Sequence, residues 1–343
     1  MKQQTHGGDI YRHKEVLDFS SNMNPLGVPA GVYRALEENL CNIRNYPDTE
    51  CEELKKALAE HEQIAKEWIV CGNGAAELIY TLAQAIRPQK ALIQSPTFLE
   101  YERALQSVEC NISYYKAKRE NAFRVQEDFL DHITTELDMI FLCNPNNPTG
   151  TLIEPDLMRV ICKKCREQNV WLIIDECFLD FLPEKSVYTM KKELEQNSKI
   201  FILKAFTKLY AMAGLRLGYG MTGSQELLAE MSRMVQPWNV SVPAQTAGVA
   251  ALKEEAYVKA GRELVRQENI RMKKRMQEMG YRCLDSKVNY IFFEGPQDLY
   301  EKCLKEGILI RDCSNYVGLR KGDYRIAIRR QEENDRLLEV LTK

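Results

Sequence analysis

Short apolar runs, two of them separated by a helical pattern, constrain the fold of this chain more than any other feature of its sequence. The runs ALIQS (91–95), MIFLC (139–143), WLIID (171–175) and KIFILKAF (199–206) have the length and composition of buried strands. A helical pattern at 155–168 separates two of them, as in strand–helix–strand units. The pattern predicts a large α/β domain with a mostly parallel, mixed sheet and helices on both faces.

The C-terminal third has a different pattern of predicted helices and strands. Residues 243–280 form one long helical pattern, which we expect to be bent or broken between elements. VNYIFFE (288–294), ILIRDC (308–313) and YRIAIR (324–329) then have the character of strands. With the closing helical pattern at 332–343, they predict a smaller α+β domain.

The length supports two domains, because 343 residues exceed the usual size of one compact unit. We expect residues 1–40 to form an N-terminal arm and part of the small domain. The large domain is predicted over 41–242 and the small C-terminal domain over 243–343.

Composition excludes several classes of protein. The chain is 45% hydrophobic and 28% charged, with a net charge of −2 and mixed signs throughout, so no basic stripe predicts nucleic-acid binding. The apolar runs are too short to span a membrane, and the first 16 residues lack the apolar core of a secretory signal. Eleven cysteines at irregular spacing favour reduced thiols over a disulfide framework. We therefore expect a cytoplasmic protein.

The sequence predicts no metal site. Cys162 and Cys165 have a paired spacing, but they lie in a helical pattern without a second pair or a histidine nearby, so helix packing is favoured. No two of the four histidines, His6, His13, His61 and His132, are spaced as the ligands of a metal ion would be.

A glycine turn at Gly72-Asn-Gly74-Ala-Ala-Glu77 nearly matches the fingerprint of dinucleotide-binding enzymes. A nicotinamide dehydrogenase is disfavoured, because Glu77 replaces the third small residue and no acidic residue ends a strand about 20 positions later. The N–H groups of Gly74, Ala75 and Ala76 instead open a helix whose positive end suits one phosphate.

One lysine stands between two strands. Lys208 follows the strand at 199–206 and precedes GLRLGYGM (214–221), which places its amine in a turn at the edge of a core. Most lysines extend into solvent, but a partly desolvated lysine at a strand end is also what a Schiff-base mechanism needs. Arg216 supplies a cation near that amine, suited to a phosphorylated cofactor.

Other candidate site residues follow predicted strands or lie in loops. Phe98, Asn147 and Asp175 fall at the carboxyl edge of the sheet, where a ring could stack on a planar ligand and a carboxylate could face a pyridine nitrogen. Phe98 as core and Asp175 as a loop cap are the simpler alternatives. The arm beginning His6-Gly7-Gly8 is either an ordinary terminus or an anion site made of an imidazole and exposed N–H groups.

Two arginines fall in predicted strands of the small domain. Arg311 and Arg325 could form ordinary surface ion pairs, which is the commoner outcome for an arginine. Near a cleft they would instead bind a carboxylate and a phosphate in bidentate fashion.

With these residues in this order, the chain resembles the fold type I pyridoxal-phosphate enzymes, the aspartate aminotransferase superfamily. The resemblance covers essentially the whole chain and depends on NPNNPTG (144–150), a strand ending in DE, and TK followed by GLRLGY. Within this group the chain is similar to the L-threonine O-3-phosphate decarboxylases of cobalamin synthesis, on HGGDIY, LDFSSNMNPLG, DECFLDFLP and RDCSN. Histidinol-phosphate aminotransferases share the same main motifs.

The resemblance implies a role for each matching residue. Lys208 would bind pyridoxal 5'-phosphate covalently, Asp175 would face its ring nitrogen, Asn147 its 3-oxygen and Phe98 its ring. The cofactor phosphate would be held by a set of small residues, a hydroxyl and a cation, namely Gly74, Ala75, Ala76, Thr207 and Arg216. Tyr46 would reach the phosphate in the other subunit's site, which implies a homodimer with a shared active site. The substrate would be held by His6, Gly7, Asn22, Asn147, Arg311 and Arg325, with Arg325 on the α-carboxylate and His6 with Arg311 near the phosphate.

Two positions depart from the superfamily pattern. Phe178 stands where many aminotransferases carry a tyrosine that bonds the 3-oxygen, and the phenylalanine matches the decarboxylase subfamily. Ala205 stands where a serine or threonine usually helps to bind the phosphate, so cofactor affinity would lose one charge-assisted hydrogen bond, roughly 1.5–3 kcal/mol if nothing replaces it.

The resemblance therefore implies decarboxylation of L-threonine O-3-phosphate to (R)-1-amino-2-propanol phosphate and carbon dioxide. Histidinol-phosphate transamination is the main alternative, and phosphoserine decarboxylation is a close variant, since one methyl group discriminates by only about 1–3 kcal/mol. A non-catalytic binding protein on this fold is disfavoured, because Lys208 and Asp175 are both present.

Overall fold

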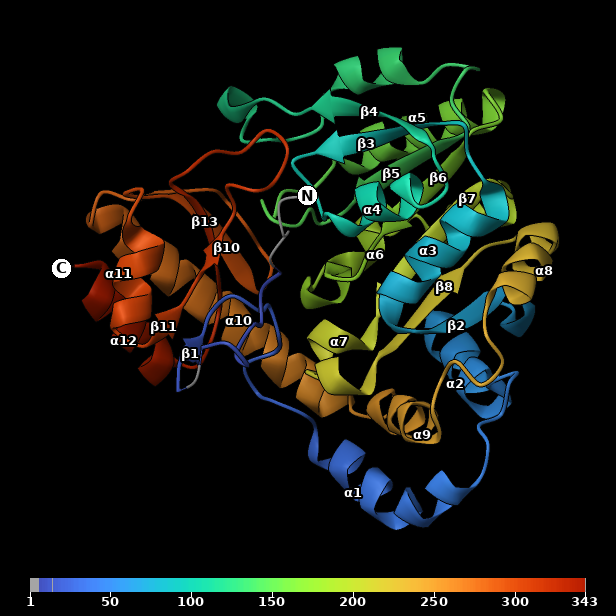
Figure 1. The fold of residues 1–343 in the computed structure, drawn as a ribbon, viewed down its shortest axis with the longest axis horizontal. Helices are drawn as coiled ribbons and strands as arrows, with labels where there is room; N and C mark the ends of the chain where they lie inside the picture. The colour runs from blue at the N-terminus through green and yellow to red at the C-terminus, as the bar shows by residue number, and fades with distance from the viewer. Residues whose placement is uncertain (1–5, 14, 343) are drawn as a thin grey trace.

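The computed structural model describes residues 6–13 and 15–342. Figure 1 shows a larger body built on a central sheet and a smaller body built on a second sheet, with the N-terminal end of the described chain between them. The long helix α10 (Glu255–Glu278) runs from one body toward the other.

The central sheet has seven strands in the order β2-β8-β7-β6-β5-β3-β4. Strand β8 runs antiparallel to both of its neighbours, β2 and β7, and the remaining pairs are parallel. The strand bounds in sequence order are β2 Ile69–Asn73, β3 Lys90–Ser95, β4 Asn111–Lys116, β5 Met139–Cys143, β6 Trp171–Asp175, β7 Ile200–Ala205 and β8 Leu217–Met221.

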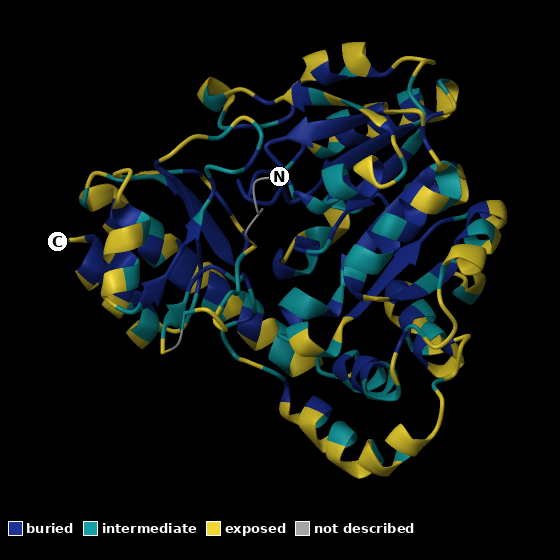
Figure 2. Ribbon diagram, viewed as in Figure 1, coloured by how far each residue is buried: buried dark blue, intermediate teal, exposed yellow. Residues whose placement is uncertain are grey.

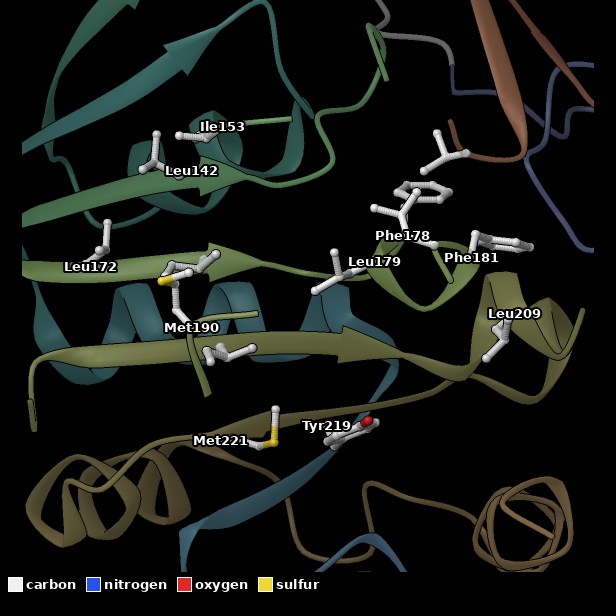
Figure 3. Close-up of a cluster of buried hydrophobic side chains, with 14 of the residues drawn as sticks. Leu142, Ile153, Leu172, Phe178, Leu179, Phe181, Met190, Leu209, Tyr219 and Met221 are labelled. Carbon is white, nitrogen blue, oxygen red and sulfur yellow. The ribbon is translucent and has the colours of Figure 1, made fainter. Parts of the chain in front are cut away.

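Alternating side chains fill both faces of this sheet, as two-sided burial of parallel strands requires. Phe141 and Ile173 pack on one face with α3 (Gly74–Ile86) and α8 (Gln225–Met234). Leu142 and Leu172 point to the opposite face, where they join Met190 in the cluster of Figure 3. The other helices of this body are α2 Glu52–Glu62, α4 Glu100–Gln106, α5 Pro155–Glu167, α6 Lys185–Tyr188, α7 Phe206–Leu209 and α9 Val242–Ala251.

The smaller body contains a four-stranded antiparallel sheet in the order β12-β13-β10-β9 and a parallel pair, β1 with β11. Its strand bounds are β1 Leu17–Asp18, β9 Arg282–Cys283, β10 Tyr290–Glu294, β11 Ile308–Leu309, β12 Arg311–Asp312 and β13 Asp323–Ala327. Helices α11 (Leu299–Lys305) and α12 (Gln331–Leu341) complete it around a core that includes Phe19, Ile291 and Phe293.

Helix α10 contributes to the cores of both bodies. Val265 belongs to the cluster under the central sheet, whereas Met272 and Met276 belong to the core of the smaller body. One continuous helix therefore joins the two cores.

Helix α1 (Ala30–Asn39) and the following 3-10 turn (Leu40–Arg44) lie along the lower edge of the molecule in Figure 1. Most of this segment is coloured as exposed in Figure 2. Its exposed residues include the apolar Tyr33, Leu40 and Ile43.

The architecture confirms the predicted fold class, a mostly parallel mixed sheet flanked by helices with a separate smaller α+β unit. The expected break in the long helical pattern is also confirmed. The helical pattern at 243–280 is two helices, α9 and α10, with a break at 252–254. Helix α2 begins at Glu52, and the Asp48 carboxylate before it accepts hydrogen bonds from the N–H groups of Glu50 (3.0 Å) and Glu52 (2.8 Å).

Within residues 6–13 and 15–342, no helix has the length and apolar character needed to cross a membrane. The same part of the chain contains no group of three or more His, Cys, Asp or Glu side chains arranged to hold a metal ion. Cys162 and Cys165 are buried in the core contacts of α5, where burial raises the pKa of Cys165 to about 12.

Candidate active site

A pocket of about 400 Å³ lies where the carboxyl ends of the central strands meet the smaller body. Both bodies line it, which brings together residues distant in the sequence. The predicted site residues in its wall are His6, Gly7, Asn22, Ala75, Ala76, Phe98, Asn147, Asp175, Thr207, Lys208, Arg216, Arg311 and Arg325. Gly74 and Tyr46 are absent from this wall.

Lys208 lies on α7, a single helical turn directly after β7. Asn24 holds this turn, because its backbone N–H donates to the Lys208 carbonyl (2.9 Å) and its side-chain amide donates to the Leu209 carbonyl (2.9 Å). Desolvation, with the nearby charge of Arg325, lowers the pKa of Lys208 to about 8. A substantial share of this amine is therefore neutral and nucleophilic near pH 8.

Asp175 is the last residue of β6 and is buried. The Tyr101 hydroxyl donates to its Oδ2 (2.5 Å), and the Cys177 N–H donates to its Oδ1 (2.9 Å). Burial raises the pKa of Asp175, while these two hydrogen bonds oppose the rise. A cationic ligand atom beside this carboxylate would be stabilised by it and would lower its pKa in turn.

The N-terminus of α3 and Arg216 form a second part of the pocket. Gly74 adopts a positive φ of 77°, and a Cβ placed there would come within 2.5 Å of the Arg216 guanidinium. Gly74 thus lies behind the guanidinium, which explains its absence from the wall, whereas Ala75 and Ala76 face the pocket beside Thr207. Helix-terminal N–H groups, a hydroxyl and a guanidinium together suit a phosphate.

Arg325 projects from β13 into the pocket and is buried. Its guanidinium donates to Asn147 Oδ1 and to the Ser20 carbonyl (2.6 Å), while its Nε has no hydrogen-bond partner among the described residues. A buried cation with an unpaired N–H is suited to a carboxylate ligand.

Arg311 lies directly opposite Arg325 in the β12–β13 register. It donates to the Asp312 carbonyl (2.5 Å) and to Asn315 Oδ1 (2.8 Å), and it stacks over the Tyr316 ring at 5.1 Å. The two neighbouring strands therefore present a pair of cations to one pocket.

The N-terminal arm reaches the pocket at His6 and Gly7. A Cβ on Gly7 would lie 2.2 Å from the Ser20 carbonyl oxygen, so only glycine fits this close approach. The Gly8 N–H donates to Ser20 Oγ (2.7 Å). The Gly8 N–H is therefore not available to an anion, because it attaches the arm to Ser20.

Several pocket residues were missed by sequence reasoning. Glu100 on α4 and Ser20 in the LDFSSN stretch line the pocket, and Tyr101 on α4 contacts the pocket residue Asp175. None of the three stands in a sequence pattern that specifies a partner. The only local signal was position, since α4 directly follows the carboxyl end of β3.

The two departures from the superfamily pattern both lie in the wall. Phe178 packs edge-on against Tyr290 with ring centroids 4.9 Å apart, and Ala205 ends β7. These positions present hydrocarbon to the pocket.

Tyr46 lies outside the pocket of its own chain. Its side chain is 79% exposed and stacks on Trp238 with ring centroids 4.5 Å apart.

Comparison with known proteins places this geometry in a family. The model of the family described as aminotransferase class I and II matches residues 14–341. The chain belongs to that family. Its match spans both bodies and every predicted site residue from Asn22 to Arg325.

Several proteins with a named activity are similar to this chain over most of their lengths. A threonine-phosphate decarboxylase of Salmonella typhimurium is 38% identical over 348 aligned residues, covering 98% of this chain and 95% of the relative. A histidinol-phosphate aminotransferase of Moorella thermoacetica is 32% identical, covering 87% of this chain and 78% of the relative. The solved structure of the histidinol-phosphate aminotransferase from Clostridium acetobutylicum superposes with a TM-score of 0.88 at 29% identity, covering 95% of this chain and 98% of that one.

Proposed function

We propose that this chain is a pyridoxal-phosphate enzyme that decarboxylates L-threonine O-3-phosphate to (R)-1-amino-2-propanol phosphate and carbon dioxide, a reaction of cobalamin biosynthesis. The observation that carries the proposal is the facing pair Arg311 and Arg325, which offers two anion sites beyond the cradle around Arg216. Similarity to the Salmonella typhimurium threonine-phosphate decarboxylase over 98% of the chain supports the choice of substrate.

The residues present fit pyridoxal phosphate. A Cβ on Gly74 would clash with the Arg216 guanidinium, so the glycine leaves room for that cation, and Lys208 in the same pocket has a pKa lowered to about 8. In our proposal Ala75, Ala76, Thr207, Arg216 and the Gly74 backbone hold the phosphate. Lys208 holds the aldehyde carbon, Asp175 the ring nitrogen, Asn147 the 3-oxygen and Phe98 the ring face.

When bound, pyridoxal phosphate supplies an electron sink for the bond broken at the substrate Cα. The protein must orient that bond and manage one proton. Arg325 would bind the α-carboxylate, with Asn147 and Ser20 fixing its guanidinium. Arg311 and His6 would bind the phosphate, and Asn22 and Gly7 would line the remaining space.

The proton step is assigned to Lys208. After carbon dioxide leaves, Cα needs one proton to give the amine product, and Lys208 Nζ is an amine in this wall that both accepts and donates a proton near neutral pH. Asp175 remains an anchored carboxylate during this step, since Tyr101 and Cys177 bind its two oxygens.

Histidinol-phosphate transamination is the second candidate, favoured by the similarity to aminotransferases in sequence and structure. Phe178 argues against it, because the hydrocarbon there offers no hydroxyl to the 3-oxygen. Phosphoserine decarboxylation differs by one methyl group and would use the same contacts.

We also propose a homodimer with shared active sites. Tyr46 is too exposed to serve its own pocket, and it continues an exposed apolar segment that includes Tyr33, Leu40 and Ile43. Burial of this segment against a second copy would bring Tyr46 to the partner's phosphate cradle.

The remaining proposals concern location and domains. All eleven cysteines are free thiols, which supports a reducing cytoplasm. We retain the division into residues 1–40, 41–242 and 243–343 as a proposal. The pairing of β1 with β11 supports the attachment of the N-terminal segment to the small domain, whereas α9 packs in the core of the larger body.

The test mixes holoenzyme with L-threonine O-3-phosphate and measures carbon dioxide and the amine product. A parallel reaction contains histidinol phosphate and 2-oxoglutarate. We expect carbon dioxide in the first reaction, no amino-group exchange in the second, and neither product with Lys208→Ala. Exchange in the second reaction alone would overturn the decarboxylase assignment and support the aminotransferase.

A further inference from the structure

Glu100 is an unexpected feature of a pocket proposed to bind anions. It lies at the start of α4, lines the pocket, and its side chain is 13% exposed. A free carboxylate here would repel both a phosphate and a substrate carboxylate. Its presence therefore needs a compensating role.

Three donors surround this carboxylate. His6 Nε2 lies 2.9 Å from Glu100 Oε1, and Arg103 Nη1 lies 2.9 Å from the same oxygen. The Tyr80 hydroxyl donates to Oε2 at 3.2 Å. Burial alone would raise the pKa of Glu100, but His6 and Arg103 hold it below its usual range, so the group is an ionised and neutralised carboxylate.

The carboxylate also makes the position of His6 possible. His6 Nε2 is 3.0 Å from Arg103 Nη1, so a neutral imidazole can accept a hydrogen bond from the guanidinium, whereas a protonated imidazole is repelled by it. Glu100 accepts from both and offsets this repulsion. His6, Glu100 and Arg103 together then present a net positive charge when the imidazole is protonated.

This contact fixes the arm at its outer end. Gly7 and Gly8 dock against Ser20, whose carbonyl accepts from Arg325, while His6 crosses to α4 on the larger body, 6.3 Å from the Phe98 ring centroid. The arm thus spans the pocket mouth between two attachment points.

We propose that Glu100, together with Arg103, is a positioning residue that holds His6 and the arm 6–8 over the pocket, so that His6 can bind the substrate phosphate. The proposal rests on the proposed function for the identity of that phosphate. Glu100 touches His6 and not the reacting atoms, so it acts on binding rather than on the chemical step.

The test is a double-mutant cycle of Glu100→Gln and His6→Asn in the holoenzyme. Inorganic phosphate is titrated in a calorimeter, and KM and kcat are measured with L-threonine O-3-phosphate. We expect Glu100→Gln to weaken phosphate binding and raise KM about fivefold, with kcat changed less than about twofold. In the His6→Asn background the same substitution should have no further effect.

Glu102→Gln is the matched control, because Glu102 lies on the same helix, outside the pocket, and accepts from Gln106 (2.9 Å). It should behave like the wild type. The proposal would be overturned if Glu100→Gln weakened phosphate binding equally in the wild-type and His6→Asn backgrounds, or if it lowered kcat alone. Failure of the proposed function would show separately, because the wild-type protein would then release no carbon dioxide. The phosphate titration would still measure the coupling between Glu100 and His6.

Discussion

Lys208 and Asp175, two ionisable residues of the pocket, differ in how the protein shifts their pKa values. Desolvation and Arg325 lower the pKa of Lys208, which favours the neutral amine. Asp175 is held by two donors against the effect of its own burial. One group is thereby able to react and to exchange a proton, and the other is fixed in place.

Tyr101 is the residue whose loss should disturb this arrangement first. Tyr101→Phe removes the 2.5 Å hydrogen bond to Asp175 and keeps the stacking on Phe141 at 4.8 Å. Since hydrogen bonds to charged groups contribute about 1.5–3 kcal/mol, we expect kcat/KM to fall by about tenfold or more. Steady-state kinetics checks this, with circular dichroism to confirm the fold. Wild-type kinetics would show that the tyrosine hydroxyl does not support the carboxylate.

The sequence predicted the candidate site residues that lie at strand ends, but it did not predict the side chains that contact them. Lys208, Asn147 and Asp175 follow apolar runs that could only be strands, so their common edge followed from chain order. Tyr101 and Glu100 sit on a short helix, and their partners are 74 and 94 residues away in the chain. No local pattern encodes such contacts.

At the scale of elements, β8 packs closely against the N-terminus of α3, which forms part of the proposed phosphate site. A Cβ on Gly218 would lie 2.5 Å from the Ala75 backbone nitrogen and 2.8 Å from the Gly74 carbonyl carbon. The glycine-rich pattern indicated this turn, but the contact between the two elements required the antiparallel pairing of β2 with β8.

Gly218→Ala should push α3 away from the strand. We expect a loss of about 1–3 kcal/mol in the free energy of unfolding and weaker cofactor binding, because backbone atoms cannot give way as a flexible side chain can. Chemical denaturation and cofactor titration measure both. Gly214→Ala is the control, since a Cβ there meets nothing within 4 Å. Equal behaviour of the two variants would refute the packing argument.

A buried ionic cluster links α2, β6 and β7 beneath the pocket. Lys204 on β7 contacts Glu62 (3.0 Å) and Asp180 (2.8 Å), and Glu176 accepts from Thr189 (2.8 Å) and the Met190 N–H (3.0 Å). Burial raises the pKa of Glu176 to about 7, whereas the pKa of Glu62 is about 2, because Lys204 and Tyr219 outweigh its desolvation.

Glu176→Gln should change how stability depends on pH. A raised folded-state pKa gives stability that is present below the unfolded value near 4.5 and is lost as pH rises through about 7. We expect the variant to gain about 2 kcal/mol relative to wild type between pH 5 and pH 8, with Glu62 ionised throughout. Urea denaturation at several pH values measures the difference. The exposed Glu184→Gln should give a flat difference, and a flat result for Glu176→Gln would show that its carboxyl group titrates normally.

At the scale of the molecule, α10 joins two cores, and the pocket forms where their surfaces meet. The pattern of apolar and charged residues along the sequence predicted two domains and the strands of the smaller one. It could not show how they face each other, because that depends on contacts such as Arg325 with Ser20, 305 positions apart.

The proposed homodimer predicts complementation between two defective chains. Lys208→Ala and Tyr46→Ala homodimers should each be impaired, but a mixed dimer has one site with both residues intact. Random exchange of subunits should restore roughly one quarter of wild-type activity, because half of the dimers are mixed and each has one working site. Activity after mixing and refolding the two variants checks this. No recovery, despite mixed dimers seen by native mass spectrometry, would mean that Tyr46 serves no partner site.

The facing arginines have one more consequence. Arg311 and Arg325 are like charges directly opposite each other on antiparallel strands, an arrangement that weakens a sheet unless something negative lies between them. In the proposed complex, the anionic groups of the substrate would offset this repulsion and thereby stabilise the smaller body. Sulfate or phosphate in a buffer should raise the melting temperature for the same reason, through preferential binding to the folded state.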